Sequence, residues 1–311
     1  MTKVFIDGSS GTTGLQIRQR LAARPDLTLL TLPEAQRKDP EARADRMNGA
    51  DVVFLCLPDA AAVEAAGFVV DPDTCVIDTS TAHRVDPDWV YGFAELGRAE
   101  QIASAKRIAN PGCHATGFIS IVYPLVKTGL LPADTLLSCF SLTGYSGGGK
   151  SMIADYESPD RAALLSSPGI YALGQTHKHL PEMKAVCGLT HVPVFCPIVD
   201  DYFKGMATTV PLHLSLLKGV SGAGQLRRAL ADFYAGQALV RVADEQECAE
   251  AGKLYGGAMT GRDSLVIFVE GNDERCTVTA LFDNLGKGAS GAAIQNMNLA
   301  LGIDPAAGLV L

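Results

Sequence analysis

The sequence has few basic residues for its length. Its 311 residues include 26 lysines and arginines against 34 aspartates and glutamates, which gives a formal net charge of −8. A surface that binds the phosphates of a nucleic acid usually needs clustered Lys and Arg side chains. We therefore expect no nucleic-acid partner, whereas a small anionic substrate, which needs only a few local cations, is compatible with this charge.

Long hydrophobic runs are also missing. The longest apolar stretch, Phe118 to Val126, contains Pro124 and is followed by Lys127, and it is shorter than the ~20 residues that a membrane-spanning helix needs. The sequence passes from Met1 almost directly into the apolar run at Val4, without the basic and apolar segments of a leader. We expect no membrane association and a cytoplasmic location.

The cysteines show no CxxC pair. There are eight of them: Cys56, Cys75, Cys113, Cys139, Cys187, Cys196, Cys248 and Cys276. Neither a zinc knuckle nor a redox couple is indicated, and several of these cysteines lie in apolar runs, where a free thiol fills core space. We expect reduced thiols and no metal site.

What is present is an ordinary globular composition, with 47% hydrophobic and 19% charged residues in a chain long enough for two domains. In its first third, apolar runs alternate with amphipathic stretches, which is typical of a parallel α/β sheet. Strands are predicted at residues 4–6, 27–32, 51–57, 75–78 and 107–109, and helices at 11–23 and from Cys113 to Lys127.

The middle of the chain is richer in strands. They are predicted at residues 136–142, 192–199, 206–216, 265–269 and 277–282, with helices at 225–234 and 288–301. Many of these strands have no helix between them, which favours a mixed or antiparallel sheet. The predicted fold class is therefore α/β: an N-terminal Rossmann-type parallel sheet, followed by an α+β domain with a mixed or antiparallel sheet.

A glycine-rich turn follows the first predicted strand. Gly8, Gly11 and Gly14 lie between that strand and a helix, where glycines let the backbone approach a pyrophosphate at the helix N-terminus. Three hydroxyl side chains can add hydrogen-bond donors: Ser10, Thr12 and Thr13. The spacing is GxxGxxG rather than GxGxxG, so a plain tight turn is the alternative, but the position after the first strand favours a dinucleotide site.

The end of the second predicted strand bears on which dinucleotide is bound. NAD enzymes usually place an acidic residue there, for the ribose hydroxyls. This chain has Glu34 beyond the strand and then the adjacent cations Arg37 and Lys38, which suit a 2′-phosphate. We predict NADP as the cofactor; the alternative is that the two cations are simply solvated.

Cys113 is the predicted nucleophile. It follows the turn Asn110-Pro111-Gly112 and begins a predicted helix, whose N-terminus carries a partial positive charge of roughly half a unit. That field favours the thiolate. No other cysteine combines a turn with a helix start, so the alternative of a buried structural cysteine is the weaker one.

A nucleophilic thiol needs a partner that handles protons. His177 and His179 stand two residues apart in an HxH string followed by Glu182, which could orient one of them. At this spacing the two rings point in different directions in a strand or a helix, so we expect one of them to face the thiol. His114 is a weaker candidate, and three histidines are assigned structural positions: His83, His191 and His213.

Together these motifs resemble those of the N-acetyl-γ-glutamyl-phosphate reductases, in the shorter of that family's two types. Beside the glycine turn, the Pro-Gly-Cys helix start and the HxHxxE string, the resemblance covers four further stretches: residues 78–84, 91–96, 143–150 and 283–291. It implies a relationship to aspartate-semialdehyde and glyceraldehyde-3-phosphate dehydrogenases. The longer enzymes of the family commonly have an aromatic residue directly after the cysteine, where this chain has His114.

The resemblance implies a domain plan. Residues 1–113 would form the NADP-binding Rossmann domain, completed by the C-terminal helix in 284–311, and residues 114–283 the catalytic and dimerisation domain. Further cofactor contacts would come from Cys56, Leu57, Pro58, Asn284 and Gly288. Substrate contacts would come from Ser80, Arg84, Asn110, Ser146, Lys150 and Glu182.

The resemblance also implies a reaction. Cys113 would attack an acyl phosphate and release inorganic phosphate, NADPH would reduce the thioester, and His177 or His179 would act as the acid. The protein would be a homodimer or a homotetramer. Two alternatives remain at this point: a reductase of the aspartate-semialdehyde dehydrogenase kind, and a Rossmann nucleotide-binding module without catalysis.

Overall fold

The computed structural model describes all residues, 1–311. The chain divides into two compact units. The first consists of Met1–Gly112 with Ala289–Leu309, and the second of Cys113–Gly288 with Val310–Leu311. None of the helices combines the length and the apolar character needed to cross a membrane.

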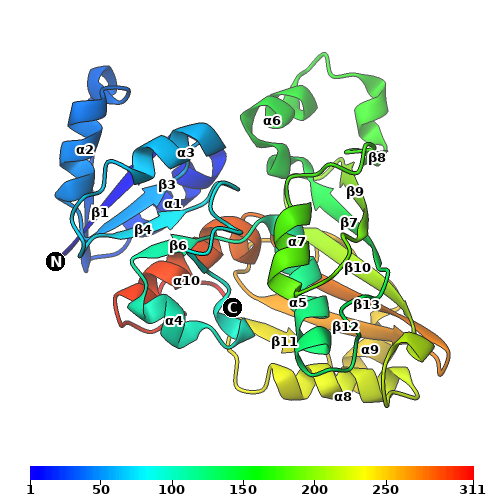
Figure 1. Cartoon of the computed structure of the whole chain (residues 1–311). Coiled ribbons are helices and arrows are strands. Elements are labelled where there is room, and N and C mark those ends of the chain that lie inside the picture. The colour runs from blue at the N-terminus through cyan, green and yellow to red at the C-terminus, as the bar shows by residue number, and fades with distance from the viewer. The chain divides into compact units, whose positions relative to one another are not determined.

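The first unit is built on a six-stranded sheet in the order β2-β1-β3-β4-β6-β5, in which every neighbouring pair is parallel (Figure 1). The strands are β1 (Thr2–Asp7), β2 (Leu27–Leu30), β3 (Val52–Leu55), β4 (Cys75–Asp78), β5 (Val90–Tyr91) and β6 (Arg107–Ala109). The Rossmann-type prediction is confirmed. β2 and β3 end two residues earlier than predicted, since Pro33 and Pro58 turn the chain after each of them.

Helices flank this sheet and share its core. They are α1 (Thr12–Ala22), α2 (Pro40–Asn48), α3 (Asp59–Ala66), α4 (Ala99–Ser104) and α10 (Gly291–Ala300). Ile294 and Met297 of α10 are buried in one cluster with Val4 and Ile77 of the strands. A segment from the end of the chain therefore completes the core of the first unit.

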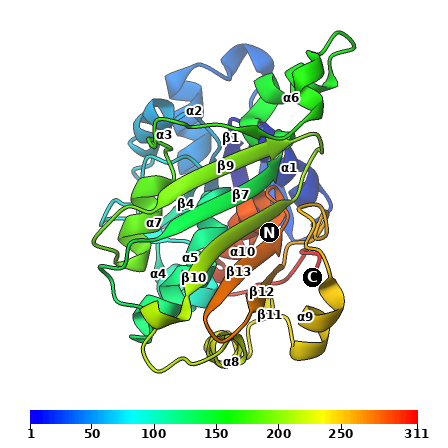
Figure 2. The same ribbon diagram turned by 90° about the vertical axis from the view of Figure 1, so that its right-hand side faces the viewer.

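The second unit contains a seven-stranded mixed sheet in the order β11-β12-β13-β10-β7-β9-β8 (Figure 2). Its strands are β7 (Ser138–Gly144), β8 (Gly169–Ile170), β9 (Val194–Asp200), β10 (Met206–His213), β11 (Val240–Val242), β12 (Leu265–Gly271) and β13 (Arg275–Phe282). The pairs β11–β12 and β7–β9 are parallel and the other pairs antiparallel. The predicted mixed sheet is confirmed, while the short strands β8 and β11 had no sequence pattern long enough to predict them.

Helices of the second unit are α5 (Cys113–Lys127), α6 (Gly149–Glu157), α7 (Leu180–Cys187), α8 (Ala223–Phe233) and α9 (Glu245–Ala251). Helix α5 packs on β10 and β13 and against α7. Gly117 allows the close approach, because a Cβ there would collide with the side chain of Thr208. Cys113 is the first residue of this helix, so packing of α5 on the sheet determines where the thiol lies.

No helix covers the opposite face of the mixed sheet along β7 and β9 (Figure 2), whereas over β12 that face packs against Cys248 of α9 and Met259. Along β7 and β9 the side chains alternate, so that Cys139, Phe195 and Val199 are buried while Phe140 and Val194 are exposed. We call the side with Phe140 and Val194 the open face.

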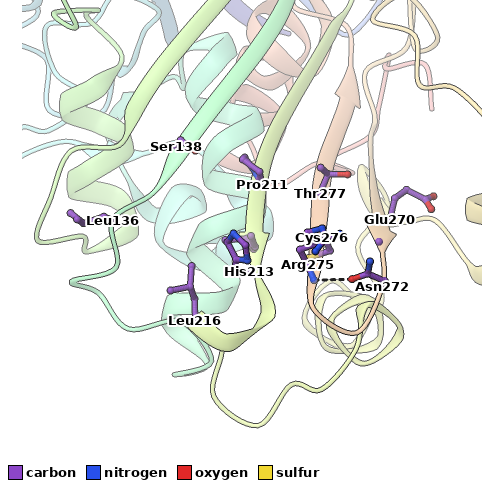
Figure 3. Close-up of a pocket in the computed structure, with 12 residues that line it drawn as sticks. Leu136, Ser138, Pro211, His213, Leu216, Glu270, Asn272, Arg275, Cys276 and Thr277 are labelled. Atoms are coloured by element: carbon purple, nitrogen blue, oxygen red, sulfur yellow. Dashed lines mark hydrogen bonds between the residues drawn. The ribbon is translucent and has the colours of Figure 1, made fainter.

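A pocket of about 640 Å³ lies at one end of β10, β13 and the β12–β13 hairpin (Figure 3). It includes Ser138, Pro211, His213 and Thr277 in its lining. Cys113 and His177 are not part of this lining.

Candidate active site

The glycine turn lies where the strand order of the parallel sheet reverses, between β1 and β3. Ligands of open α/β sheets bind at such a switch point. Gly8 has φ +81°, and a Cβ there would collide with the carbonyl of Cys56 at the end of β3. A Cβ on Gly14 would in turn collide with the carbonyl of Gly8. Both glycines are therefore required by the backbone path.

The N-terminus of α1 is open to an anion. Gly11 is its N-cap residue, no side chain caps the helix, and no acidic residue lies in its first turn. The N–H of Gly11 donates to the carbonyl of Gly8 at 3.0 Å. The N–H groups of the first turn point outward from the helix end. Ser10 is exposed and Thr12 and Thr13 are half-buried at this end.

The two cations predicted for the 2′-phosphate lie after β2. The guanidinium of Arg37 forms an ion pair with Glu34 at 2.6 Å, and Lys38 is exposed. A third cation in this region, Arg43 on α2, was not predicted. Its guanidinium donates twice to the buried carboxylate of Asp7, at 2.8 and 3.0 Å, and so ties α2 to the end of β1.

Ser80, Arg84 and Asn110 all lie buried in the first unit, after β4 and β6. Asp78 accepts from the hydroxyl of Ser80 at 2.6 Å and contacts His83 at 2.7 Å, so His83 has the structural position expected for it. Arg84 donates to the carbonyls of Asn110 and Thr79.

The Asn110 side chain is held from the tail of the chain. It donates to the carbonyl of Ala289 at 3.1 Å and accepts from Asn296 of α10 at 3.1 Å. This network of Arg84, Asn110 and Asn296 fixes the loop that leads into Cys113.

Cys113 is half-buried at the N-terminus of the 15-residue helix α5, which has no acidic residue in its first turn. Gly288 lies against it, since a Cβ on Gly288 would stand 3.1 Å from the Cβ of Cys113. Burial raises the pKa of the Cys75 and Cys276 thiols to about 11 and that of Cys56 to about 12. The helix N-terminus favours a thiolate at Cys113, while these three thiols stay protonated.

His114 follows Cys113, and both of its ring nitrogens have hydrogen-bond partners. Its ring is buried, with Nδ1 2.8 Å from the Ser141 hydroxyl and Nε2 2.6 Å from the Tyr171 hydroxyl. Ser141 is in turn 2.7 Å from the hydroxyl of Thr208. Burial lowers the pKa of His114 to about 3, so its imidazole is neutral in the physiological range.

The loop that carries the HxH string is held in a strained conformation. Ala172 and Gln175 have φ of 52° and 55°, a region that residues other than glycine rarely adopt. The Gln175 side chain pairs with β9 by donating to the carbonyl of Phe195 at 2.8 Å and accepting from its N–H at 2.9 Å. This pairing holds the loop in place despite the strain.

The arrangement of the two histidines differs from the expectation. Their rings are T-shaped with centroids 4.7 Å apart, and both contact His114, at 5.4 Å for His177 and 5.8 Å for His179. The string is a turn, neither strand nor helix, that ends at His179, the N-cap of α7, so the ring directions expected for a strand or a helix do not apply.

One hydrogen bond defines the chemistry of His177. The backbone N–H of His179 donates to Nδ1 of His177 at 3.1 Å. Nδ1 is then the acceptor, so a neutral His177 carries its proton on Nε2. His177 is half-buried and His179 buried, and Glu182 is buried in the first turn of α7.

The remaining predicted residues of the second unit belong to the loops after β7 and β13. The buried Ser146 accepts from the amide of Asn284 at 3.0 Å, and the Asn284 oxygen accepts from the N–H of Gly205. The Asn284 side chain therefore ties the loop after β13 both to the loop after β7 and to the β9–β10 loop. Lys150 is exposed in the first turn of α6.

Three residues of this site were not predicted: Tyr171, Ser141 and Thr208. Ser141 and Thr208 are hydroxyl residues at inward positions of strands, which is a sequence signal for a buried polar contact. Tyr171 lies in an irregular loop, where no pattern predicts its position.

Comparison with known proteins agrees with this arrangement of motifs. Residues 3–105 match the family described as "Semialdehyde dehydrogenase, NAD binding domain" and residues 113–284 the family described as "Semialdehyde dehydrogenase, dimerisation domain". A protein of Burkholderia cenocepacia named N-acetyl-gamma-glutamyl-phosphate reductase is 49% identical over 98% of both chains. One of Pseudomonas putida, named N-acetyl-gamma-glutamyl-phosphate reductase 2, is 48% identical over 96% of both.

The chain belongs to the N-acetyl-γ-glutamyl-phosphate reductase family. This confirms the resemblance inferred from the motifs. Among solved structures, aspartate semialdehyde dehydrogenase II of Vibrio cholerae has the same fold, with a TM-score of 0.73 at 15% identity over 97% of this chain and 98% of the other. The first unit thus contains the family's domain for a nicotinamide dinucleotide.

Proposed function

We propose that this chain reduces N-acetyl-γ-glutamyl phosphate to N-acetyl-L-glutamate 5-semialdehyde, with oxidation of NADPH and release of inorganic phosphate, as a step of arginine biosynthesis. The observation that carries the proposal is Cys113 at the start of α5 beside the His177 loop, in a chain 49% identical to a relative of that name. The aspartate semialdehyde dehydrogenase II of Vibrio cholerae is only 15% identical, and a binding module without catalysis needs no thiol at a helix N-terminus.

Cys113 acts as the nucleophile. Its thiolate attacks the acyl carbon, the bond to the phosphate oxygen breaks, and phosphate leaves with the electron pair, which gives a thioester on Sγ. Hydride addition converts the thioester to a thiohemiacetal oxyanion. His177 protonates that oxygen. When the carbon–sulfur bond breaks, the hydroxyl proton returns to His177, so the aldehyde is released and the thiolate is restored. Backbone N–H groups at the start of α5 stabilise the oxyanion.

His177 supplies the proton. In its protonated form His177 donates from Nε2, the nitrogen that the His179 N–H does not face, and the Gln175–Phe195 pairing holds the loop that carries it. His179, buried as the N-cap of α7, positions His177. Glu182 is proposed to complete the substrate pocket.

The first unit fits a dinucleotide. The backbone at Gly8 and Gly14 leaves no space for a side chain, and the uncapped α1 can hold a pyrophosphate. We assign Gly8, Ser10, Gly11, Thr12, Thr13 and Gly14 to the binding of the pyrophosphate. The adjacent edge of the cofactor site is assigned to Cys56, Leu57 and Pro58. Arg37 and Lys38 would hold the 2′-phosphate of NADP. When bound, the reduced nicotinamide supplies the hydride.

The remaining assignments follow the domain plan, with residues 1–113 and the helix in 284–311 as the cofactor domain and 114–283 as the catalytic domain. Asn284 and Gly288 are proposed to approach the cofactor, and Ser80, Arg84, Asn110, Ser146 and Lys150 to serve the anionic substrate. Arg84 already binds two carbonyls, so it would act mainly by holding the Asn110 loop.

We propose that the protein assembles through the open face, as a homodimer or a pair of such dimers. The face presents Phe140 and Val194, with Leu136 and Ile170 beside them, as exposed apolar side chains. Large exposed apolar patches usually mark interfaces, and the pocket of Figure 3 includes Leu136 and Ser138, at the start of β7, in its lining.

The reverse reaction tests the function. N-acetylglutamate semialdehyde, NADP and phosphate are expected to yield NADPH, whereas aspartate semialdehyde yields none and omission of phosphate stops the reaction. Cys113→Ser is expected to abolish turnover while NADPH binding persists. Turnover of aspartate semialdehyde alone would support the mechanism but contradict the proposed substrate. No turnover of either aldehyde would favour a binding module.

A further inference from the structure

The loop between β8 and α7, residues 171–179, carries His177 and is largely in contact with solvent. Residues 173–176 are exposed, and Ala172 and Gln175 adopt the left-handed region, with φ of 52° and 55°. Exposure and backbone strain both favour local opening of a loop. The position of this loop therefore depends on specific polar contacts.

One set of contacts joins the loop to β9. The backbone N–H of Tyr171 donates to the carbonyl of Pro197 at 3.1 Å, and the Gln175 side chain pairs with the backbone of Phe195. The nucleophile, however, is the first residue of α5. A fixed distance between acid and nucleophile therefore also requires a contact from the loop to α5.

His114 provides such a contact. It lies directly after Cys113 on α5, and its Nε2 is 2.6 Å from the hydroxyl of Tyr171 in the loop. The other ring nitrogen, Nδ1, is 2.8 Å from the hydroxyl of Ser141 on β7, which is itself 2.7 Å from the hydroxyl of Thr208 on β10. The ring of His114 is thus held by the sheet through one nitrogen and holds the loop through the other.

His177 lies against both partners of this bond. Its ring centroid is 5.4 Å from that of His114 and 6.0 Å from that of Tyr171, with edge-on geometry in each pair. If Tyr171 moved away from His114, His177 would lose two of the surfaces that orient its ring. Burial lowers the pKa of His114 to about 3, so this ring is uncharged and does not repel a protonated His177.

We propose that His114 is a positioning residue for the acid: its hydrogen bond to Tyr171 docks the loop on α5 and so fixes His177 relative to Cys113. In this role neither His114 nor Tyr171 exchanges a proton with the substrate. The inference rests on the proposed roles of Cys113 and His177, but it does not depend on the identity of the acyl phosphate.

Two amides at position 114 test which contact of the ring matters. The side-chain nitrogen of glutamine reaches about as far as Nε2 of histidine, and that of asparagine about as far as Nδ1. His114→Gln is therefore expected to keep the bond to Tyr171 and a kcat close to that of the unchanged protein. His114→Asn, which can keep only the bond to Ser141, is expected to lose roughly tenfold in kcat, the factor that one hydrogen bond supplies.

Tyr171→Phe removes the same bond from the other side. It is expected to show the same loss of kcat with little change in KM, and the double variant with His114→Asn is expected to lose no more, because both changes remove one bond. Tyr234→Phe is the matched control. It removes a buried hydroxyl that also bonds to α5, at the carbonyl of Ser120, and is expected to keep kcat.

Hydrogen exchange measures the docking itself in the full-length protein, without substrate. By mass spectrometry, the backbone amides of residues 171–179 are expected to exchange faster in Tyr171→Phe and His114→Asn than in the unchanged protein, His114→Gln and Tyr234→Phe. Tyr171→Phe removes one oxygen from a half-buried side chain, so it is informative even if the variants at position 114 do not fold.

Unchanged exchange of the loop in Tyr171→Phe would overturn the inference, and so would faster exchange with an unchanged kcat. Additive losses of kcat in the double variant would also contradict it. If the unchanged protein reduced no acyl phosphate while the loop of the variants exchanged faster, the proposed function would be wrong and the docking by His114 would stand.

Discussion

His177 has two nitrogens in different situations. Nδ1 accepts the backbone N–H of His179, and this leaves Nε2–H as the only donor of a neutral ring. The same contact keeps the ring at the end of α7, where its neighbours are aromatic rings: His114, Tyr171, His179 and Phe195. One backbone hydrogen bond therefore selects both the tautomer and the orientation.

His177→Asn is expected to separate these two effects. The Asn side-chain oxygen can still accept from the His179 N–H, but no acid remains at the position of Nε2. We expect kcat to fall by about 10²–10⁴-fold with little change in KM or in the melting temperature. His191→Asn, at an exposed position of the same unit, is the control. A His177→Asn variant with kcat near that of the unchanged protein would move the acid role to His179.

The buried His114 has a consequence for stability. Its folded pKa of about 3 lies below the unfolded value of 6.5, so between these two pH values the unfolded chain binds more protons. Stability from this group is therefore complete above pH 6.5 and is lost as the pH falls toward 3, with a slope of at most about 1.4 kcal/mol per pH unit.

Urea denaturation between pH 6.5 and 4.5 measures this slope. The free energy of unfolding of His114→Phe is expected to decline less steeply than that of the unchanged protein. Equal slopes for the two proteins would mean that His114 takes up a proton in the folded state.

Among the elements, the turn between β1 and α1 shows how backbone geometry prepares a binding site. A side chain is excluded at Gly8 twice, by the positive φ and by the carbonyl of Cys56. The first exclusion costs about 1–3 kcal/mol for a residue other than glycine, and the second displaces β3 or the turn itself.

Gly8→Ala is expected to lower the free energy of unfolding and to abolish NADPH binding. Gly97→Ala is the matched control in the same unit: its φ of +76° imposes the same backbone strain, but no atom lies within 4 Å of the added Cβ. It is expected to lose stability by the backbone term alone and to bind NADPH normally, as measured by fluorescence titration. Retained binding in Gly8→Ala would contradict the placement of the pyrophosphate.

At the scale of the whole molecule, the open face of the mixed sheet is the surface proposed for assembly. Phe140→Asp, in the middle of β7, places a charge among exposed apolar side chains, and burying that charge in an interface is costly. We expect the variant to run as a monomer in analytical ultracentrifugation. Val70→Asp, at an exposed apolar position of the first unit, is expected to keep the assembly. A Phe140→Asp variant of unchanged mass would place the interface elsewhere.

Local patterns in the chain predict much of this protein. Hydrophobic periodicity predicts strands β1 and β4 and the helix from Cys113 to Lys127. It also predicts the change from alternating strands and helices to grouped strands. The glycine turn and the predicted nucleophile can be identified from their residue types, because few other local structures require glycines or a cysteine at such positions. These features are encoded within a few neighbouring residues, so they can be read without knowing what the chain folds against.

The contacts around the nucleophile could not be derived in that way. His114 meets Ser141 and Tyr171, which are 27 and 57 residues away along the chain, and Ser141 meets Thr208, another 67 residues on. The T-shaped pair His177–His179 needs a turn that is held by Gln175 on β9. Such contacts arise when α5 and the loop that carries Tyr171 and His177 pack on the folded sheet. No local sequence pattern predicts which distant hydroxyl will contact which ring. The sequence thus predicts a nucleophile and its acid, whereas the orientation and the buried partners of these residues come from the fold.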